Sequence, residues 1–384
     1  MKKIFLSFIM LGSSFLAQAQ GMPSDTLRPA EQRTSIGGYG QVDLNSSLGD
    51  GEAGLAELDV HRLVLLLGHR FSERVSILTE IEFEHVQEVY IEQAYLDYRI
   101  KPWLSVRGGL VLIPMGIINL YHESATFHSV ERPLPDHSLS PTTWREIGAG
   151  ISGKSLALGW KYEAYVVNGF LSHNGESGLI GGANGFRSGR QKGAESIMKY
   201  PNLAARAEYF GIDGLEAGMS VYTGKTQSAL HGLIGPEFAS ARADSSVVGI
   251  LMFGLDARYA RAGWQFRAQA YHSSQSGTEA YNELTGRDLG KAMAGYYLEA
   301  SYDLLHTCTR KSGALFPFFR YSALDMHYRT EGMAGNPSYR KQAITAGLSY
   351  MPAPGTAFKA GYERIKDGND QVQQSLQAGI AFTF

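Results

Sequence analysis

A two-residue alternation of apolar and polar side chains constrains this chain more than any other feature. Successive side chains of a β-strand point to opposite faces, so such a segment has one apolar and one polar face. The clearest case is the C-terminal segment, where the apolar face holds Val372, Leu376, Ala378, Ile380, Phe382 and Phe384 and the other face holds Gln373, Ser375, Gln377, Gly379, Ala381 and Thr383. Repetition of this pattern in segments of about ten residues is typical of a transmembrane β-barrel.

The alternation recurs along the chain in sixteen predicted strands. They span 36–45, 58–70, 75–85, 89–99, 104–111, 147–153, 156–168, 203–211, 215–224, 247–260, 264–273, 293–305, 315–328, 342–351, 357–367 and 372–384. Several polar faces carry charge, as in the Glu80, Glu82 and Glu84 series. A charged side chain facing lipid at the midplane costs roughly 2–4 kcal/mol for Arg or Lys, so we expect these faces to line a wet lumen.

The connections between the predicted strands alternate between short and long. Residues 71–74, 100–103, 154–155, 212–214 and 261–263 are tight turns, whereas 112–146, 169–202, 225–246 and 274–292 are long. Outer-membrane barrels have short periplasmic turns and long outer loops, and an even strand number returns the C-terminus to the periplasm. The sequence therefore predicts an all-β fold, a 16-stranded antiparallel transmembrane barrel. Its glycine-rich segment 169–202 is expected to be a surface loop.

Aromatic residues are expected to form a girdle at the periplasmic interface, where amphipathic rings collect. The residues that fall at the predicted periplasmic strand ends are Trp103, Tyr259, Trp264, Tyr302, Phe316, Tyr350, Phe358 and Phe384.

The N-terminus has the three parts of a secretory signal peptide. Lys2 and Lys3 precede the apolar stretch 4–16, and Ala17-Gln18-Ala19 offers the small residues that signal peptidase recognises. We therefore expect a signal peptide at 1–19, a short periplasmic segment at 20–35 and the barrel at 36–384, exported to the outer membrane of a Gram-negative bacterium.

Composition narrows the possible partners. Without Lys2 and Lys3 the formal charge of −2 becomes −4, which argues against nucleic acid as a partner. A single cysteine, Cys308, excludes a disulfide framework and a thiolate metal site. The expected partners are outer-membrane lipid and the barrel assembly machinery, and no cofactor is expected.

From Ser35 to about Gly153 the sequence resembles the phosphate-selective porin O and P family. The residues that carry the resemblance are Gly37-Gly38-Tyr39-Gly40, Asp59-Val60-His61-Arg62-Leu63-Val64, Glu92-Gln93-Ala94-Tyr95, Arg107-Gly108-Gly109, Pro114-Met115-Gly116-Ile117-Ile118-Asn119, His122-Glu123, Phe127, Val130-Glu131-Arg132-Pro133, Pro141-Thr142-Thr143-Trp144, Glu146, Gly148 and Gly150. The resemblance covers about a third of the mature chain. It implies a homotrimer of 16-stranded channels, a third outer loop folded into the lumen, and selectivity for anions such as phosphate.

Candidate site residues gather in the third loop and on the early strands. The predicted pore constriction or binding site comprises His122, Glu123, Glu131, Arg132 and Arg145, and the predicted lumen wall includes Arg62, Glu80, Glu82, Glu84 and Arg107. Fixed charges in a narrow passage select solutes by sign and size. The histidines and glutamates of the loop match no compact metal-ligand spacing, so no metal site is predicted. Besides the charged constriction, two alternative interpretations of these residues are metal binding and a hydrogen-bonded loop pinned to the wall.

Two functions remain open at this point. The first is a passive diffusion channel for small solutes, with phosphate-like anions implied by the resemblance. The second is a structural or adhesive barrel whose loops contact a partner. No nucleophile-elbow or other catalytic constellation is recognisable, so the chain is not expected to be an enzyme.

Overall fold

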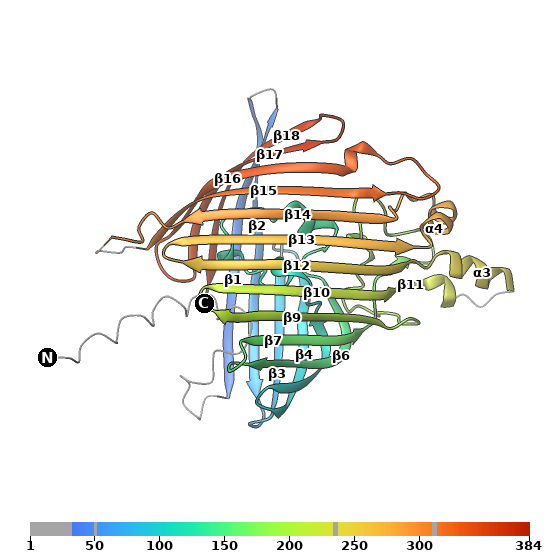
Figure 1. Cartoon of the computed structure of the whole chain (residues 1–384), viewed down its shortest axis with the longest axis horizontal. Helices are drawn as coiled ribbons and strands as arrows, with labels where there is room; N and C mark the ends of the chain where they lie inside the picture. Colours follow the sequence, from blue (N-terminus) through green and yellow to red (C-terminus); the bar gives the residue numbers. More distant parts are fainter. Residues whose placement is uncertain (1–32, 50–51, 233–236, 309–312) are drawn as a thin grey trace.

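The computed structural model describes residues 33–49, 52–232, 237–308 and 313–384, and sixteen of their strands form one closed antiparallel barrel (Figure 1). Closure satisfies every strand edge, which a sheet in lipid requires. In chain order the barrel strands are β1 (Thr34–Gly49), β2 (Glu52–Arg70), β3 (Val75–Glu84), β4 (Glu88–Lys101), β5 (Leu104–Leu112), β6 (Arg145–Ser155), β7 (Trp160–Val167), β9 (Asn202–Ile212), β10 (Leu215–Lys225), β12 (Gly249–Arg261), β13 (Trp264–Ser276), β14 (Ala292–Tyr302), β15 (Ala314–Arg329), β16 (Arg340–Met351), β17 (Thr356–Asp367) and β18 (Val372–Thr383).

The barrel closes where the first strand meets the last. β1 pairs with β2 on one side and with β18 on the other, in the register Tyr39 to Thr383. Gly38 and Phe384 then exchange two backbone hydrogen bonds of 3.0 and 2.9 Å. The predicted fold and strand number are confirmed, and the described barrel starts at Thr34 rather than at residue 36.

The predicted alternation corresponds to the two faces of the wall. On β18, Leu376 and Ile380 are each 46% exposed on the outside, whereas Gln377 between them points inwards and is 5% exposed. The aromatic prediction is wrong for Phe316, which is 6% exposed and points into the lumen, where its ring lies against His128. A period of two assigns a face only when the register of the alternation is right.

The non-barrel elements lie in the long connections. These elements are α1 (Gly116–Leu120), η1 (Ser124–Thr126), α2 (Leu134–Ser138), β8 (Leu171–His173), η2 (Arg187–Gly189), β11 (Gln227–Ser228), η3 (Ala229–Gly232), α3 (Glu237–Ser245), α4 (Thr278–Thr285) and η4 (Pro337–Tyr339). α3 and α4 project at the end opposite to the C-terminus (Figure 1), and β8 pairs with β11 in a small parallel sheet. Within the described part of the chain, no helix has the length and apolarity needed to cross a membrane.

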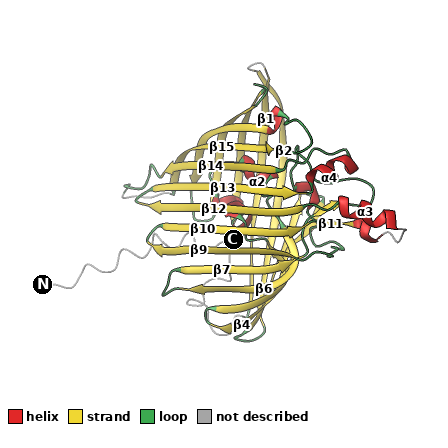
Figure 2. Ribbon diagram, turned by 45° about the vertical axis from the view of Figure 1, so that its right-hand side comes forward, coloured by secondary structure: helices red, strands yellow, loops and turns green. Residues whose placement is uncertain are grey.

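The third loop, residues 113–144 between β5 and β6, runs inside the barrel. Its helix α2 lies within the outline of the strands, against β14 and β15 (Figure 2). The predicted inward fold of this loop is confirmed. The proposed signal peptide at 1–19 and most of the segment at 20–35 lie outside the described residues.

Candidate functional site

The third loop enters the lumen at Gly116. This glycine has a φ of +74°, and a Cβ built on it would lie 1.9 Å from the hydroxyl of Tyr271 on β13. The next residue, Ile117, donates its backbone N–H to Gln269 Oε1 at 2.7 Å. Only glycine combines this backbone conformation with so close an approach. The loop is therefore carried from β5 across the lumen to β13.

Asn119 joins the two ends of the loop. Its amide nitrogen donates to the carbonyls of Ile113 at 2.8 Å and Trp144 at 3.0 Å, and its Oδ1 accepts the Trp144 N–H at 2.8 Å. The side chain is fully buried. A buried amide with these three bonds holds the neck of the loop closed, because it links backbone groups from both ends of the loop.

Basic side chains of the far wall hold the loop's carbonyl groups. Lys359 on β17 donates to the carbonyls of Ser124 and Ser129, and Arg320 on β15 donates to that of Glu131 at 3.0 Å. Charge-assisted hydrogen bonds are stronger than neutral ones, and these cations are buried against the loop. Lys359 and Arg320 thus fasten the distal part of the loop to the far wall.

The short helix α2 docks through Asp136, which is fully buried. Its Oδ1 accepts a hydrogen bond of 2.7 Å from the hydroxyl of Tyr271. Burial raises the pKa of this loop carboxyl to about 7, while the bond from Tyr271 acts in the opposite direction.

An aromatic cluster covers the other side of the loop neck. Trp144 stacks on Phe170 at 4.5 Å and contacts Tyr222 at 4.6 Å, and Phe170 stacks on Phe186 at 5.0 Å between ring centroids. Phe170 and Phe186 belong to the segment between β7 and β9. The prediction that 169–202 is a surface loop is therefore wrong for Phe170, Ile180 and Phe186, which are buried beside the third loop.

Wall charges at mid-height are paired with one another. Arg62 lies 3.4 Å from Glu82, Arg206 lies 2.8 Å from Glu208, and Arg320 lies 3.7 Å from Glu299, measured between side-chain nitrogen and oxygen. All six of these side chains are buried. The expectation that charged faces look into a wet lumen needs correction, because the third loop and the pairing partners cover these side chains. Paired charges of both signs leave little net attraction for one sign of solute.

His122 lies between two wall carboxylates on neighbouring strands. Its Nε2 is 3.0 Å from Glu92 Oε2 on β4 and 3.3 Å from Glu80 Oε1 on β3. Burial lowers the pKa of this loop histidine, but Glu92 and Glu80 outweigh burial and raise it to about 10. The loop is thus fastened to the near wall as well as to the far one.

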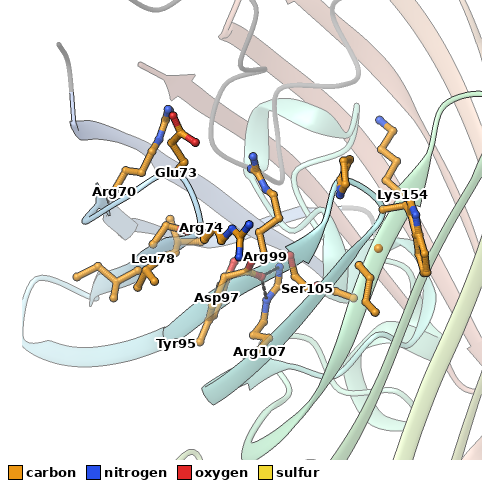
Figure 3. Close-up of a pocket in the computed structure, with 18 of the residues that line it drawn as sticks. Arg70, Glu73, Arg74, Leu78, Tyr95, Asp97, Arg99, Ser105, Arg107 and Lys154 are labelled. Atoms are coloured by element: carbon orange, nitrogen blue, oxygen red, sulfur yellow. Dashed lines mark hydrogen bonds and ion pairs between the residues drawn. The ribbon is translucent and has the colours of Figure 1, made fainter. Parts of the chain in front are cut away.

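An open cavity lies at the short-turn end of the barrel and is lined by residues of strands β2 to β7 and their turns (Figure 3). It has a volume of about 350 Å³. Its charged lining residues are Arg70, Arg74, Arg99, Arg107, Lys154 and Lys161 against Glu73, Asp97 and Glu163. Arg107 is anchored there by Asp97 at 3.2 Å and by the ring of Tyr95, 4.2 Å from the ring centroid. Six basic against three acidic groups give this cavity a positive balance.

Comparison with solved structures shows the same architecture in several bacterial outer-membrane proteins. An anion-selective porin from Comamonas acidovorans matches with a TM-score of 0.59 at 13% identity, over 91% of this chain and 99% of the other. The outer-membrane channel DcaP of Acinetobacter baumannii matches with a TM-score of 0.58 at 13% identity, over 91% and 97%. The chain has the fold of an outer-membrane porin.

Sequence comparison adds a relative of unassigned function. An uncharacterised protein of Aquifex aeolicus (strain VF5) is 28% identical over 404 residues, covering 100% of this chain and 87% of that protein. No protein-family model matches the chain.

On this porin fold two of the predicted loop residues, His122 and Arg145, meet at Glu92, whereas Glu131 and Arg132 hydrogen-bond to other residues. Glu131 accepts a hydrogen bond of 3.1 Å from Asn45, and Arg132 donates one of 2.7 Å to Thr142. Glu123 is 8% exposed, and Arg145, which begins β6, lies 3.5 Å from Glu92.

The predicted wall residues lie on the inner face of the early strands. Arg62, Glu80 and Glu82 are buried under the loop, Glu84 is partly exposed, and Arg107 lies apart from them in the cavity. Sequence reasoning missed Glu92 as a site residue. A β-bulge between β3 and β4 skips Glu92 in the pairing, and the adjacent polar residues Glu92 and Gln93, which break the alternation, were its signal.

Proposed function

We propose that the chain is an outer-membrane porin of a Gram-negative bacterium, a passive diffusion channel for small solutes whose third loop controls passage. The observation that carries the proposal is a closed 16-stranded barrel whose inner face is polar and charged around an inserted third loop. A barrel that only anchored surface loops would not need such a built interior. The loop contacts both near and far walls, so we expect a small conductance.

The solute preference follows from the placement of charge. The mid-height charges are paired, whereas the cavity at the short-turn end has more basic than acidic groups. We propose a weak preference for anions, in line with the resemblance to phosphate-selective porins. A homotrimer is part of the proposal, and a trimer form of OmpT from Vibrio cholerae is a structural match with a TM-score of 0.54 at 9% identity over 92% of this chain and 100% of that one.

Conductance of the purified protein in planar lipid bilayers tests the channel. The wild type should give small, resolved current steps, and a variant in which a short Gly-Ser linker replaces residues 117–142 should give larger ones. Both proteins are first checked for the heat-modifiable, folded form on gels. If both are folded and neither conducts, the alternative of a structural or adhesive barrel replaces the channel.

A further inference from the structure

Three potential metal ligands from three separate elements meet beneath the third loop. Among the described residues, Glu80, Glu92 and His122 are the one group of three His, Cys, Asp or Glu side chains with ligand atoms all within 4.8 Å of one another. Their exposed fractions are 2%, 0% and 4%. Two buried carboxylates this close together need compensating positive charge, part of which Arg145 supplies at 3.5 Å from Glu92.

The orientation of His122 is that of a metal ligand. Its Nδ1 lies 3.2 Å from the carbonyl oxygen of Asn119, which can only accept a hydrogen bond, so Nδ1 carries a proton. Metal-binding histidines commonly use the second ring nitrogen in this way to fix the ring. Nε2 then faces Glu80 and Glu92 together. A single proton on Nε2 can form a straight hydrogen bond to only one of them, whereas a metal ion can bind both.

The two distances from His122 Nε2 fit a small tetrahedral site. With metal–ligand bonds of about 2.0–2.1 Å, the ligand atoms of a tetrahedron lie roughly 3.3 Å apart. The observed separations from His122 Nε2 are 3.0 and 3.3 Å. We propose that Glu80, Glu92 and His122 form a Zn²⁺ site with an open fourth position, which fastens the third loop to the barrel wall.

Neighbouring donors hold both carboxylates, as in an outer coordination shell. Gln93 Nε2 donates to Glu80 Oε2 at 2.6 Å, and the Tyr39 hydroxyl donates at 2.9 Å to Oε1, the atom that faces His122. Glu92 uses Oε1 for Arg145 and keeps Oε2 for the site. These donors orient the ligands.

The ligand types favour a zinc-like cation. One nitrogen and two oxygen ligands suit Zn²⁺, whereas Ca²⁺ takes six to eight oxygens and Mg²⁺ requires an octahedron.

Metal content measured by mass spectrometry tests the site on the full-length, detergent-solubilised protein. The protein is refolded with ZnCl₂ and passed through gel filtration. The wild type should retain one Zn²⁺ per chain, and the variants His122→Ala and Glu92→Gln should retain almost none. His128→Ala is the matched control, because this second buried loop histidine contacts Gln265 and Ser301 instead of carboxylates, and it should retain one. Zinc-free wild type, or full retention in His122→Ala, overturns the proposal.

Two further measurements keep the test decisive if a ligand variant does not fold. X-ray absorption at the zinc edge of the wild type should show one imidazole and oxygen ligands in four-coordination, and a shell without imidazole overturns the site. Gln93→Ala removes only a donor to Glu80 and should weaken Zn²⁺ binding by roughly tenfold. An unchanged affinity in that folded variant contradicts the outer-shell role. Neither readout depends on conduction, so the site stands or falls separately from the channel.

Discussion

Single residues of the third loop and of the wall determine whether the loop can lie in the lumen. Gly116 accommodates the crossing to β13, Asn119 closes the neck, and Lys359 holds two carbonyls of the distal part. Other residue types cannot make these contacts. Gly116 is required for its backbone conformation, and Asn119 and Lys359 are required for their buried hydrogen bonds.

Gly116→Ala should displace the start of the loop. The added methyl group would overlap the Tyr271 hydroxyl, and φ of +74° is strained for alanine, so we expect lower thermal stability in detergent and altered conductance. Gly108→Ala on β5 is the control, since its Cβ would meet nothing closer than 3.7 Å. Melting is followed by the shift between folded and unfolded bands on gels, and equal melting of the two variants would contradict the prediction.

Lys359→Met should loosen the distal part of the loop. The change leaves the carbonyls of Ser124 and Ser129 without this buried donor, at a cost of about 1–3 kcal/mol. We expect a lower unfolding midpoint and noisier open-channel current. Lys366→Met on the same strand is the control, because Lys366 forms its ion pair with the exposed Asp370. If the unfolding midpoint falls as far in Lys366→Met as in Lys359→Met, the destabilisation is due to the lost charge alone.

At the scale of elements, strand alternation and connection length give the barrel its two ends. The tight turns at 213–214 and 262–263 lie at the opposite end from the long connections that carry α3 and α4 (Figure 1). A strand needs only two to four residues to reverse direction, so the long segments have another use. In this barrel two of them fill the lumen.

Cysteine labelling on intact cells checks which end faces outwards. In a Cys308→Ser background, Glu176→Cys on the long connection should react with a membrane-impermeant thiol reagent, and Asp213→Cys should not. Both positions are exposed, so accessibility within the chain does not bias the comparison. Labelling at 213 with none at 176 would reverse the assigned orientation.

Deletion of Phe384 should lower the amount of assembled barrel. Its backbone exchanges two hydrogen bonds with Gly38, and its ring is 64% exposed at the short-turn end. The deletion weakens the closing pair and removes the terminal aromatic that the assembly machinery is expected to read. Phe384→Tyr keeps both features and serves as the control. The folded fraction in outer-membrane extracts is measured, and wild-type levels after deletion would refute the role.

For the whole molecule, the cavity at one mouth of the lumen has more basic than acidic lining residues, whereas charges at mid-height are paired. The cavity of Figure 3 gathers its basic residues from turns and strand ends that are far apart in sequence. Neutralised pairs at mid-height contribute little long-range field, whereas an unbalanced mouth raises the local concentration of counter-ions.

Reversal potentials in a salt gradient measure this contribution. Arg74→Glu combined with Lys154→Glu reverses two positive charges of the cavity and should shift selectivity towards cations, with a smaller effect at high salt. Arg261→Glu is the control at the same end, since Arg261 is not among the cavity residues and its side chain is 63% exposed. An equal shift in the control would show that the cavity has no special role.

The sequence by itself determined the barrel, its sixteen strands and its two ends, because a period of two and a turn length are local properties of the chain. It also indicated the inserted third loop, through the apolar start at 111–115 and the family resemblance. The register of each alternation was less secure, as Phe316 shows, since one irregularity exchanges the two faces.

Only the tertiary structure decided which residues meet inside the lumen. Ile117 bonds to Gln269 and Ser124 to Lys359, and His122 meets Glu80 and Glu92 although the three are well separated in sequence. Alternation predicts that a side chain points inwards, but its height in the barrel and its partner across the lumen depend on strand stagger, bulges and the path of the loop. Strand stagger, bulges and the path of the loop are set by closure of the whole sheet. No local segment of the sequence carries that information.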